Sequence, residues 1–111
     1  MPMIHLKSQQ EIPADLLHEI STMMAETIGK PEQYVMVVSG IADLMMSGTA
    51  GNAVYADIKS LGGLSRVVNH EITMKLCILF NDHLGIPGDR IYVTFQSLER
   101  DHWGWDGSTF G

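Results

Sequence analysis

Apolar residues recur at two different spacings along the chain, and the change of spacing predicts the order of the elements. Met3, Ile4 and Leu6 predict a short strand close to the start. Pro13 then opens a predicted helix, whose apolar stripe at spacings of three and four consists of Leu16, Leu17, Ile20, Met23, Met24, Thr27 and Ile28. Gly29 and Pro31 are typical of a helix end. The β-prone run of residues 34–38 predicts the next strand.

The second half of the chain repeats this plan. Residues 53–59 alternate as a strand, and Ser65 is placed to cap a helix with the apolar face Val68, Ile72, Leu76, Leu79, Phe80 and Leu84. Gly85 and Pro87 end that helix, and residues 90–95 predict another strand. Aligning Gly29 with Gly85 also aligns Pro31 with Pro87, Val35 with Ile91 and Val37 with Val93, at a constant offset of 56 residues. We therefore predict two copies of one β-α-β unit.

This repeat predicts an α+β fold. A helical crossover joins parallel strands, so two such units form a four-stranded mixed sheet with both helices on one face. Alternation also leaves apolar residues for the opposite face, and we expect that face to be buried against other subunits. The length of 111 residues fits a single domain over residues 1–111.

Charge and composition narrow the class of partner. The net charge of −6 disfavours nucleic acid and anionic membrane surfaces. No secretory leader and no apolar run near the ~20 residues of a membrane span are seen, so we expect a cytoplasmic protein. Cys77 lies in an apolar run and is expected to be a buried small hydrophobe. The histidines lack ligand spacing, and we expect no metal site.

Pro2 follows the initiator Met1 directly, and a proline at this position can become an N-terminal base. A small second residue permits removal of the methionine, and the chain would then begin with a secondary amine. An α-amino group has a pKa near neutrality, at about 7.7–8.0, which burial or a neighbouring cation lowers further. Such an amine is a general base. Taken alone, the Met-Pro start is a weak signal, and an ordinary start to a first strand is the default explanation of Pro2.

Three further segments have both a structural and a chemical reading. Lys30 either complements the helix dipole or points its ammonium at a substrate carboxylate. Residues 60–65 either simply connect a strand to a helix or present backbone N–H groups to an oxygen atom. The aromatic residues of the glycine-rich tail 103–111 wall a pocket, dock on a neighbouring chain, or cover the core. The glycine-rich residues 47–52 read as a turn between the halves.

Four segments in order carry a resemblance to a known family. Residues 1–4 (Met-Pro-Met-Ile), 29–35 (Gly-Lys-Pro-Glu-Gln-Tyr-Val), 89–93 (Asp-Arg-Ile-Tyr-Val) and 104–110 (Gly-Trp-Asp-Gly-Ser-Thr-Phe) resemble the macrophage migration inhibitory factor family of the tautomerase superfamily. The resemblance is collinear over essentially the whole chain. It implies a β-α-β repeat that assembles as a homotrimer, with active sites at the subunit interfaces.

The same resemblance implies roles for individual residues. Pro2 matches the catalytic proline that acts as general base and then acid. The residues that match substrate-binding positions are Lys30, Leu61 through its backbone N–H, Tyr92 from the adjacent subunit, Thr94, Trp103, Trp105 and Phe110. Thr94 stands where the animal cytokines have asparagine, and Trp103 replaces a smaller aliphatic residue and is expected to narrow the mouth of the site.

The implied activity is keto–enol tautomerisation of phenylpyruvate-like or dopachrome-like keto acids, with no metal or organic cofactor. The resemblance also leaves open a cytokine-like signalling or host-interaction role with a vestigial pocket, a receptor, and secretion without a signal peptide. Another proline-dependent reaction on a small unsaturated acid is a third hypothesis. Ala53 and Ala56 occupy the two cysteine positions of the animal cytokine, so thiol–disulfide exchange is not supported.

Overall fold

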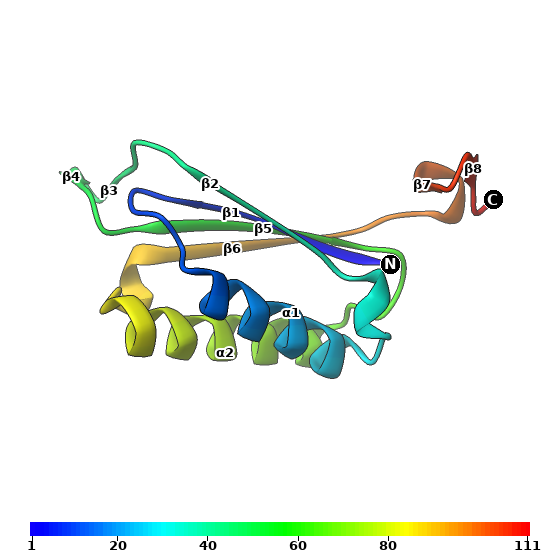
Figure 1. Ribbon diagram of the computed structural model, residues 1–111, viewed down its shortest axis with the longest axis horizontal. Helices are drawn as coiled ribbons and strands as arrows, with labels where there is room; N and C mark the ends of the chain where they lie inside the picture. Colours follow the sequence, from blue (N-terminus) through cyan, green and yellow to red (C-terminus); the bar gives the residue numbers. More distant parts are fainter.

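The computed structural model describes residues 1–111 and has two layers, a four-stranded sheet and a pair of helices on one of its faces (Figure 1). The sheet is formed by β1 (Pro2–Ser8), β2 (Met36–Ile41), β5 (Val54–Ser60) and β6 (Ile91–Ser97). The covering layer consists of α1 (Ala14–Ile28) and α2 (Arg66–Leu84). Neither helix is long and apolar enough to cross a membrane.

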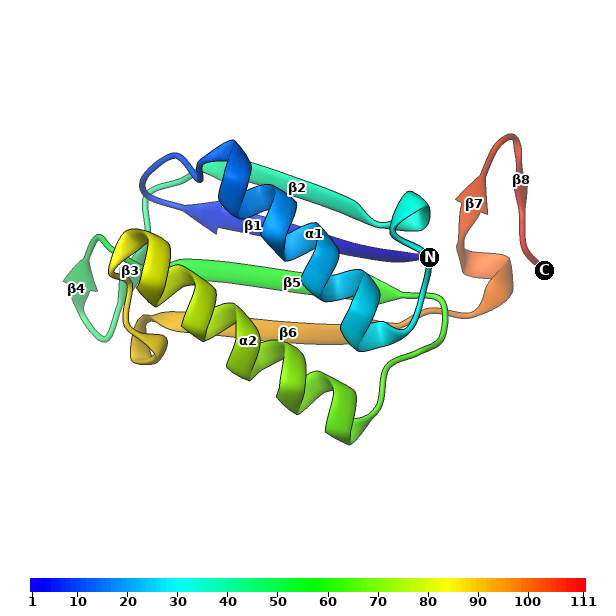
Figure 2. The ribbon, with the colours of Figure 1, turned by 60° about the horizontal axis from the view of Figure 1, so that its bottom comes forward.

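The strand order confirms the two predicted β-α-β units. The strands lie in the order β2-β1-β5-β6, with β1 parallel to β2, β5 parallel to β6, and the central pair β1 and β5 antiparallel. Each parallel pair is joined by one helix, and the two helices lie side by side over the same face (Figure 2). The mixed sheet therefore arises from two crossovers that meet along one antiparallel seam.

The repeat extends to the turns that follow the helices. Gly29 and Gly85 both end their helix in the left-handed conformation, with φ of 79° and 67°. Each is followed by a 3-10 turn at the same offset, η1 (Glu32–Tyr34) and η2 (Gly88–Arg90). These turns correct two predicted strand starts. Tyr34 and Arg90 complete the 3-10 turns through their backbone N–H groups, so each strand begins later than predicted.

The core lies between the sheet and the helices. Ile72, Leu76 and Phe80 of α2 are fully buried, as are Ile4 and Leu6 of β1, which point toward the helices. The predicted cap is confirmed, since the Ser65 hydroxyl oxygen accepts a hydrogen bond of 3.1 Å from the Val68 N–H. Such a cap stabilises a helix by roughly 1 kcal/mol.

Cys77 is less buried than predicted. It is only half-buried on α2 and packs against the edge of the core. Partial burial still raises the pKa of its thiol, because the charged thiolate is disfavoured there. The helix stripe that is fully covered passes through Ile72, Leu76 and Phe80, and Cys77 lies beside this stripe rather than on it.

The face of the sheet away from the helices is more polar than predicted. Alternation along the central strands places His5, Lys7, Asp57 and Lys59 on this face, and the register sets His5 beside Asp57. Asp57 accepts a 2.9 Å hydrogen bond from the Thr94 hydroxyl and lies 3.6 Å from the Lys59 ammonium. This face therefore carries charged side chains on its central strands in addition to the apolar residues that were predicted.

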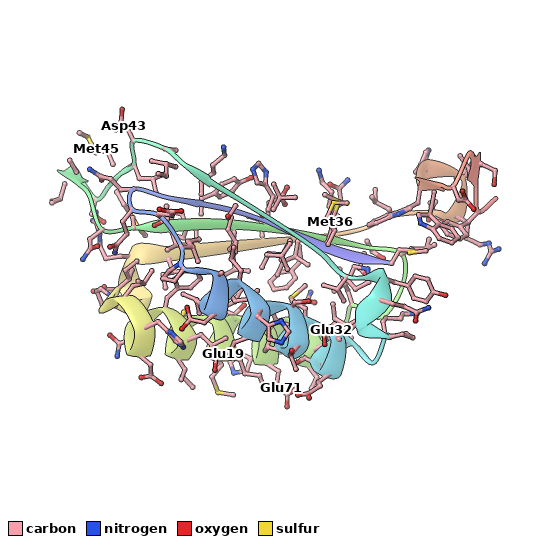
Figure 3. The ribbon with its side chains drawn as sticks, in the orientation of Figure 1. Glu19, Glu32, Met36, Asp43, Met45 and Glu71 are labelled. Atoms are coloured by element: carbon pink, nitrogen blue, oxygen red, sulfur yellow. The ribbon has the colours of Figure 1, made fainter.

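Apolar side chains on that face lie on both edge strands, and Met3 and Tyr55 add two on the central strands β1 and β5. Met36 and Val38 belong to β2, and Tyr92 to β6; the exposed fraction of Tyr92 is 67%. Figure 3 shows Met36 directed away from the helical layer, on the opposite side from Glu19 and Glu71. An open sheet with exposed apolar edges is a surface that a second protein chain can cover.

Two small hairpins extend beyond the sheet at opposite ends (Figure 1). The sequence predicted only a turn where β3 (Met45–Met46) and β4 (Thr49–Ala50) form a hairpin, and the tail forms β7 (Gly104–Trp105) and β8 (Ser108–Thr109). Arg90 anchors the first hairpin. Its guanidinium donates hydrogen bonds to the backbone oxygens of Met46, Thr49 and Gly51 at 2.6, 2.9 and 2.6 Å.

Candidate active site

A cavity opens where the start of β1 meets the C-terminal hairpin. Both the N-terminus and β7–β8 lie at this end of the sheet in Figures 1 and 2. The cavity has a volume of about 620 Å³. Most of its lining is hydrophobic, and the lining residues are Met1, Pro2, Met3, Gln33, Tyr34, Val35, Met36, Leu98, His102, Trp103, Gly104 and Trp105. It is a largely apolar site with few polar groups, which is the usual character of a small-molecule pocket.

Aromatic side chains form one wall of this cavity. Trp105 meets Tyr34 edge to face, with ring centroids 6.2 Å apart, and stacks on Phe110 at 6.4 Å with an interplanar angle of 4°. The Phe110 N–H donates to the backbone oxygens of Arg100 and Trp103, which fixes the end of the tail. The structure thus brings Trp103 and Trp105 to the cavity, while Phe110 supports Trp105 from outside the lining.

The N-terminus is part of the cavity wall. Pro2 is fully buried, and the Met1 carbonyl oxygen accepts a 3.2 Å hydrogen bond from the Leu61 N–H. Burial, followed by the positive charge of Lys30, lowers the pKa of the Met1 α-amino group from its ordinary value. Both causes disfavour the charged amine. The site therefore combines a weakened α-amino base with a backbone donor that already binds one oxygen atom.

Lys30 lies behind the N-terminus, against the turn that carries Leu61. Gly62 and Gly63 both have left-handed backbones, with φ of +76° and +85°. A β-carbon on Gly62 would lie 3.9 Å from Lys30 Nζ, and one on Gly63 would lie 3.4 Å from Lys30 Cε. Neither Lys30 nor Leu61 lines the cavity. Both interact with Met1, which does: the Lys30 charge helps to lower the pKa of its amine, and the Leu61 N–H donates to its carbonyl oxygen. The glycine pair leaves the space in which the lysine stem lies.

Tyr92 and Thr94 are not brought to this cavity within one chain. Through their partners in β5, the register places Tyr92 level with Lys7 and Thr94 level with His5. At about 3.3 Å per residue, these levels lie roughly 17 Å and 10 Å along β1 from Pro2. A site that includes Tyr92 together with Pro2 must therefore take the two residues from different subunits.

Sequence reasoning missed part of the lining. The lining residues that it did not select as site residues include Gln33, Tyr34, Met36, Leu98 and His102. The sequence did contain a signal for Gln33, Tyr34 and Met36. They lie at the start of a predicted strand parallel to β1, and parallel strands begin at the same end of the sheet, which is the end that holds Pro2. The structure pairs Met3 with Met36 in this way.

The polar chemistry of the site is limited to a few groups. The α-amino end, the Lys30 ammonium and the Leu61 N–H meet at one wall, and Gln33 and His102 lie among the lining residues. No group of three or more His, Cys, Asp or Glu side chains is arranged to hold a metal ion. Such a set is suited to moving a proton at a carbon atom next to an anion and to hydrogen-bonding the resulting oxygen charge.

Comparison with known proteins agrees with this geometry. The family model described as macrophage migration inhibitory factor (MIF) matches residues 1–111. The macrophage migration inhibitory factor homolog of Trichuris trichiura is 36% identical over 91% of this chain and 90% of its own length, and the factor of Rattus norvegicus is 31% identical over 99% of both. A crystal structure of the homologue from Prochlorococcus marinus has a TM-score of 0.88 at 36% identity and covers 98% of this chain and 99% of that chain. The chain therefore belongs to the macrophage migration inhibitory factor family of the tautomerase superfamily, and it has that family's fold.

Proposed function

We propose that this protein is a keto–enol tautomerase that acts on phenylpyruvate-like or dopachrome-like keto acids, and that residues 1–111 form one tautomerase domain. The observation that carries the proposal is the state of the N-terminus. The Met1 α-amino group, whose pKa is lowered by burial and by Lys30, lies at an apolar cavity, and the Leu61 N–H beside it binds the Met1 carbonyl oxygen. These are the three elements that enolisation of a keto acid needs.

Removal of Met1 changes this wall in two ways. It converts the nitrogen of Pro2 from an amide into a secondary amine, which is basic, and it frees the Leu61 N–H from the Met1 carbonyl oxygen. Burial and the Lys30 charge then act on the new amine as they act on that of Met1, and keep it neutral at lower pH. Processing thus supplies both the base and the oxygen-binding donor.

The proposed reaction moves one proton through Pro2. The neutral amine takes a proton from the carbon next to the keto group. The electron pair of that C–H bond forms the new carbon–carbon double bond, and the π electron pair of the carbonyl group moves to its oxygen. The Leu61 N–H and the positive charge of Lys30 stabilise the oxygen and carboxylate charge. The prolinium then gives its proton to the oxygen, or back to carbon in the reverse direction. The step needs no oxidant, metal or organic cofactor.

The aromatic wall supports a substrate with an aryl group. Trp103, Trp105 and Tyr34 surround a largely hydrophobic cavity, and Phe110 holds Trp105 in place. A phenyl ring stacked on such side chains gains about 0.5–1.5 kcal/mol beyond the burial of its area. Trp103 adds bulk at the mouth and favours flat aryl groups over branched ones.

We further propose that the active protein is a homotrimer. The exposed edge residues and the open sheet face are the surfaces that other copies would cover. In that assembly Tyr92 and Thr94 of one subunit complete the cavity next to Pro2 of another, a contact that one chain cannot make. Sedimentation at micromolar concentration tests this assembly, and a stable monomer would contradict it.

A Pro2→Gly variant tests the catalytic proposal. Glycine keeps an N-terminal amine after Met1 removal but replaces the secondary amine with a primary one on a freer backbone. We expect phenylpyruvate tautomerisation to fall by roughly 10²–10⁴, the range typical of a lost proton-transfer group. Intact mass must first show that Met1 is absent from both samples. Turnover equal to that of the original chain would contradict the role of Pro2.

A further inference from the structure

Ser60 is one of two buried polar side chains in the protein, and it lies at the point where three parts of the site meet. It ends β5, is fully buried, and pairs across the sheet with Pro2. Its backbone oxygen accepts a 2.9 Å hydrogen bond from the N–H of Leu98, a residue that lines the cavity. Its own position is therefore fixed by the two neighbouring strands.

The hydroxyl of Ser60 forms a hydrogen bond with the turn that follows the strand. Ser60 Oγ donates a hydrogen bond of 2.6 Å to the backbone oxygen of Gly62. Leu61 lies between these two residues, and its N–H is the donor that holds the Met1 carbonyl oxygen. Gly62 and Gly63 have no side chains, so neither residue can fix the direction of the turn through a side-chain contact of its own.

We infer that Ser60 is a positioning residue, which holds the turn so that the Leu61 N–H points at the substrate oxygen beside Pro2. This inference rests on the proposed function. Ser60 does not touch the substrate; it acts through the Gly62 oxygen on the peptide plane of the turn. The Leu61 N–H stabilises the negative charge that develops on the substrate oxygen in the transition state, so it affects turnover more than substrate binding. Loss of its orientation should therefore lower kcat and leave KM nearly unchanged.

The chain supplies a matched control in Ser8. Ser8 ends β1 as Ser60 ends β5, is also almost fully buried, and lies on the same face of the sheet. Its Oγ has no hydrogen-bond partner. Ser8→Ala and Ser60→Ala therefore remove the same buried group from equivalent strand ends, but only the second removes a hydrogen bond to the site.

The experiment measures kcat and KM for phenylpyruvate on chains shown by intact mass to lack Met1. We expect Ser60→Ala to lower kcat about tenfold, less than the ~10²–10³ of a deleted oxyanion donor, with KM within about twofold. Ser8→Ala keeps both constants within about twofold, and Ser60→Thr, which retains the hydroxyl, restores most of the turnover. A Ser60→Ala variant that raises only KM, or that matches Ser8→Ala, would overturn the inference.

A second measurement separates this inference from the proposed function. In ¹⁵N-labelled protein, Ser60→Ala is expected to shift the amide signals of Leu61 and Gly62 and to speed their hydrogen exchange, whereas Ser8→Ala leaves them in place. Absence of turnover in the original chain would overturn the proposed function alone. Unmoved Leu61 and Gly62 signals in Ser60→Ala would overturn the positioning role, whatever the turnover.

Discussion

Replacing Gly63 by alanine should damage the site through a contact that the structure specifies. An alanine there must adopt a φ of +85°, which costs about 1–2 kcal/mol for a residue with a β-carbon. That β-carbon would lie 2.5 Å from Ile28 Cγ2, in the core, and 3.4 Å from Lys30 Cε. Overpacking of this kind costs about 1–3 kcal/mol more. We therefore expect the free energy of unfolding to fall by about 2–5 kcal/mol in total.

Gly62 provides the control within the same turn. Its φ is +76°, so alanine meets the same backbone strain, but its β-carbon would contact only Lys30 Nζ, at an ordinary 3.9 Å. We expect Gly62→Ala to cost about 1–2 kcal/mol. Denaturant unfolding at equal protein concentration measures both losses, since assembly makes stability concentration-dependent.

The difference between the two variants isolates the contact with Ile28 and Lys30. It should be about 1–3 kcal/mol, and Gly63→Ala should also raise KM for phenylpyruvate, because the displaced turn moves the lysine stem. Equal losses of stability in the two variants would refute the reasoning, since they would show that Ile28 does not limit the turn.

The remaining predictions concern the base, the β3–β4 hairpin and the subunit interface. Burial and then the Lys30 charge lower the pKa of the Met1 α-amino group, and we expect both to act in the same way on the Pro2 amine that replaces it. Turnover needs that amine to be neutral, so Lys30→Gln should move the rising limb of the kcat/KM profile to higher pH, and an unmoved limb would contradict this. Arg90→Met removes three hydrogen bonds to backbone oxygens and should cost about 1–3 kcal/mol, with faster hydrogen exchange confined to the hairpin; exchange spread evenly over the sheet would argue against a local anchor. Mixing refolded Pro2→Gly and Tyr92→Phe chains should restore part of the turnover that each lacks, because some mixed sites then hold both original residues; no recovery in confirmed mixed trimers would contradict a shared site.

Much of the fold was predictable because the repeat leaves periodic traces. Gly29 and Gly85 mark both helix ends, and their offset of 56 residues also fixes the 3-10 turns that follow. The two hairpins were not predictable from periodicity, since strands of two residues have no period to detect. The charged residues on the open face were not predicted, because the apolar pattern identifies only the buried positions of β5 and says nothing about Asp57 and Lys59 between them.

The candidate site likewise has residues that the sequence predicted and one that only the structure revealed. Pro2, Lys30 and the aromatic tail were selected from their chemistry and the family resemblance, and the structure brings Trp103 and Trp105 together with Pro2. The role that we infer for Ser60 has no trace in the sequence. A serine at the end of a strand is common, and only the fold shows that its hydroxyl reaches the Gly62 oxygen.

The most direct test of the central claim is to follow turnover while Met1 is removed. Protein made with methionine aminopeptidase inhibited keeps Met1, so that its Pro2 nitrogen is an amide and its Leu61 N–H is occupied by the Met1 oxygen. Treatment of this sample with the purified aminopeptidase should produce phenylpyruvate tautomerisation in proportion to the methionine lost, as read by intact mass. Full turnover before treatment, or none after complete removal of Met1, would contradict the account.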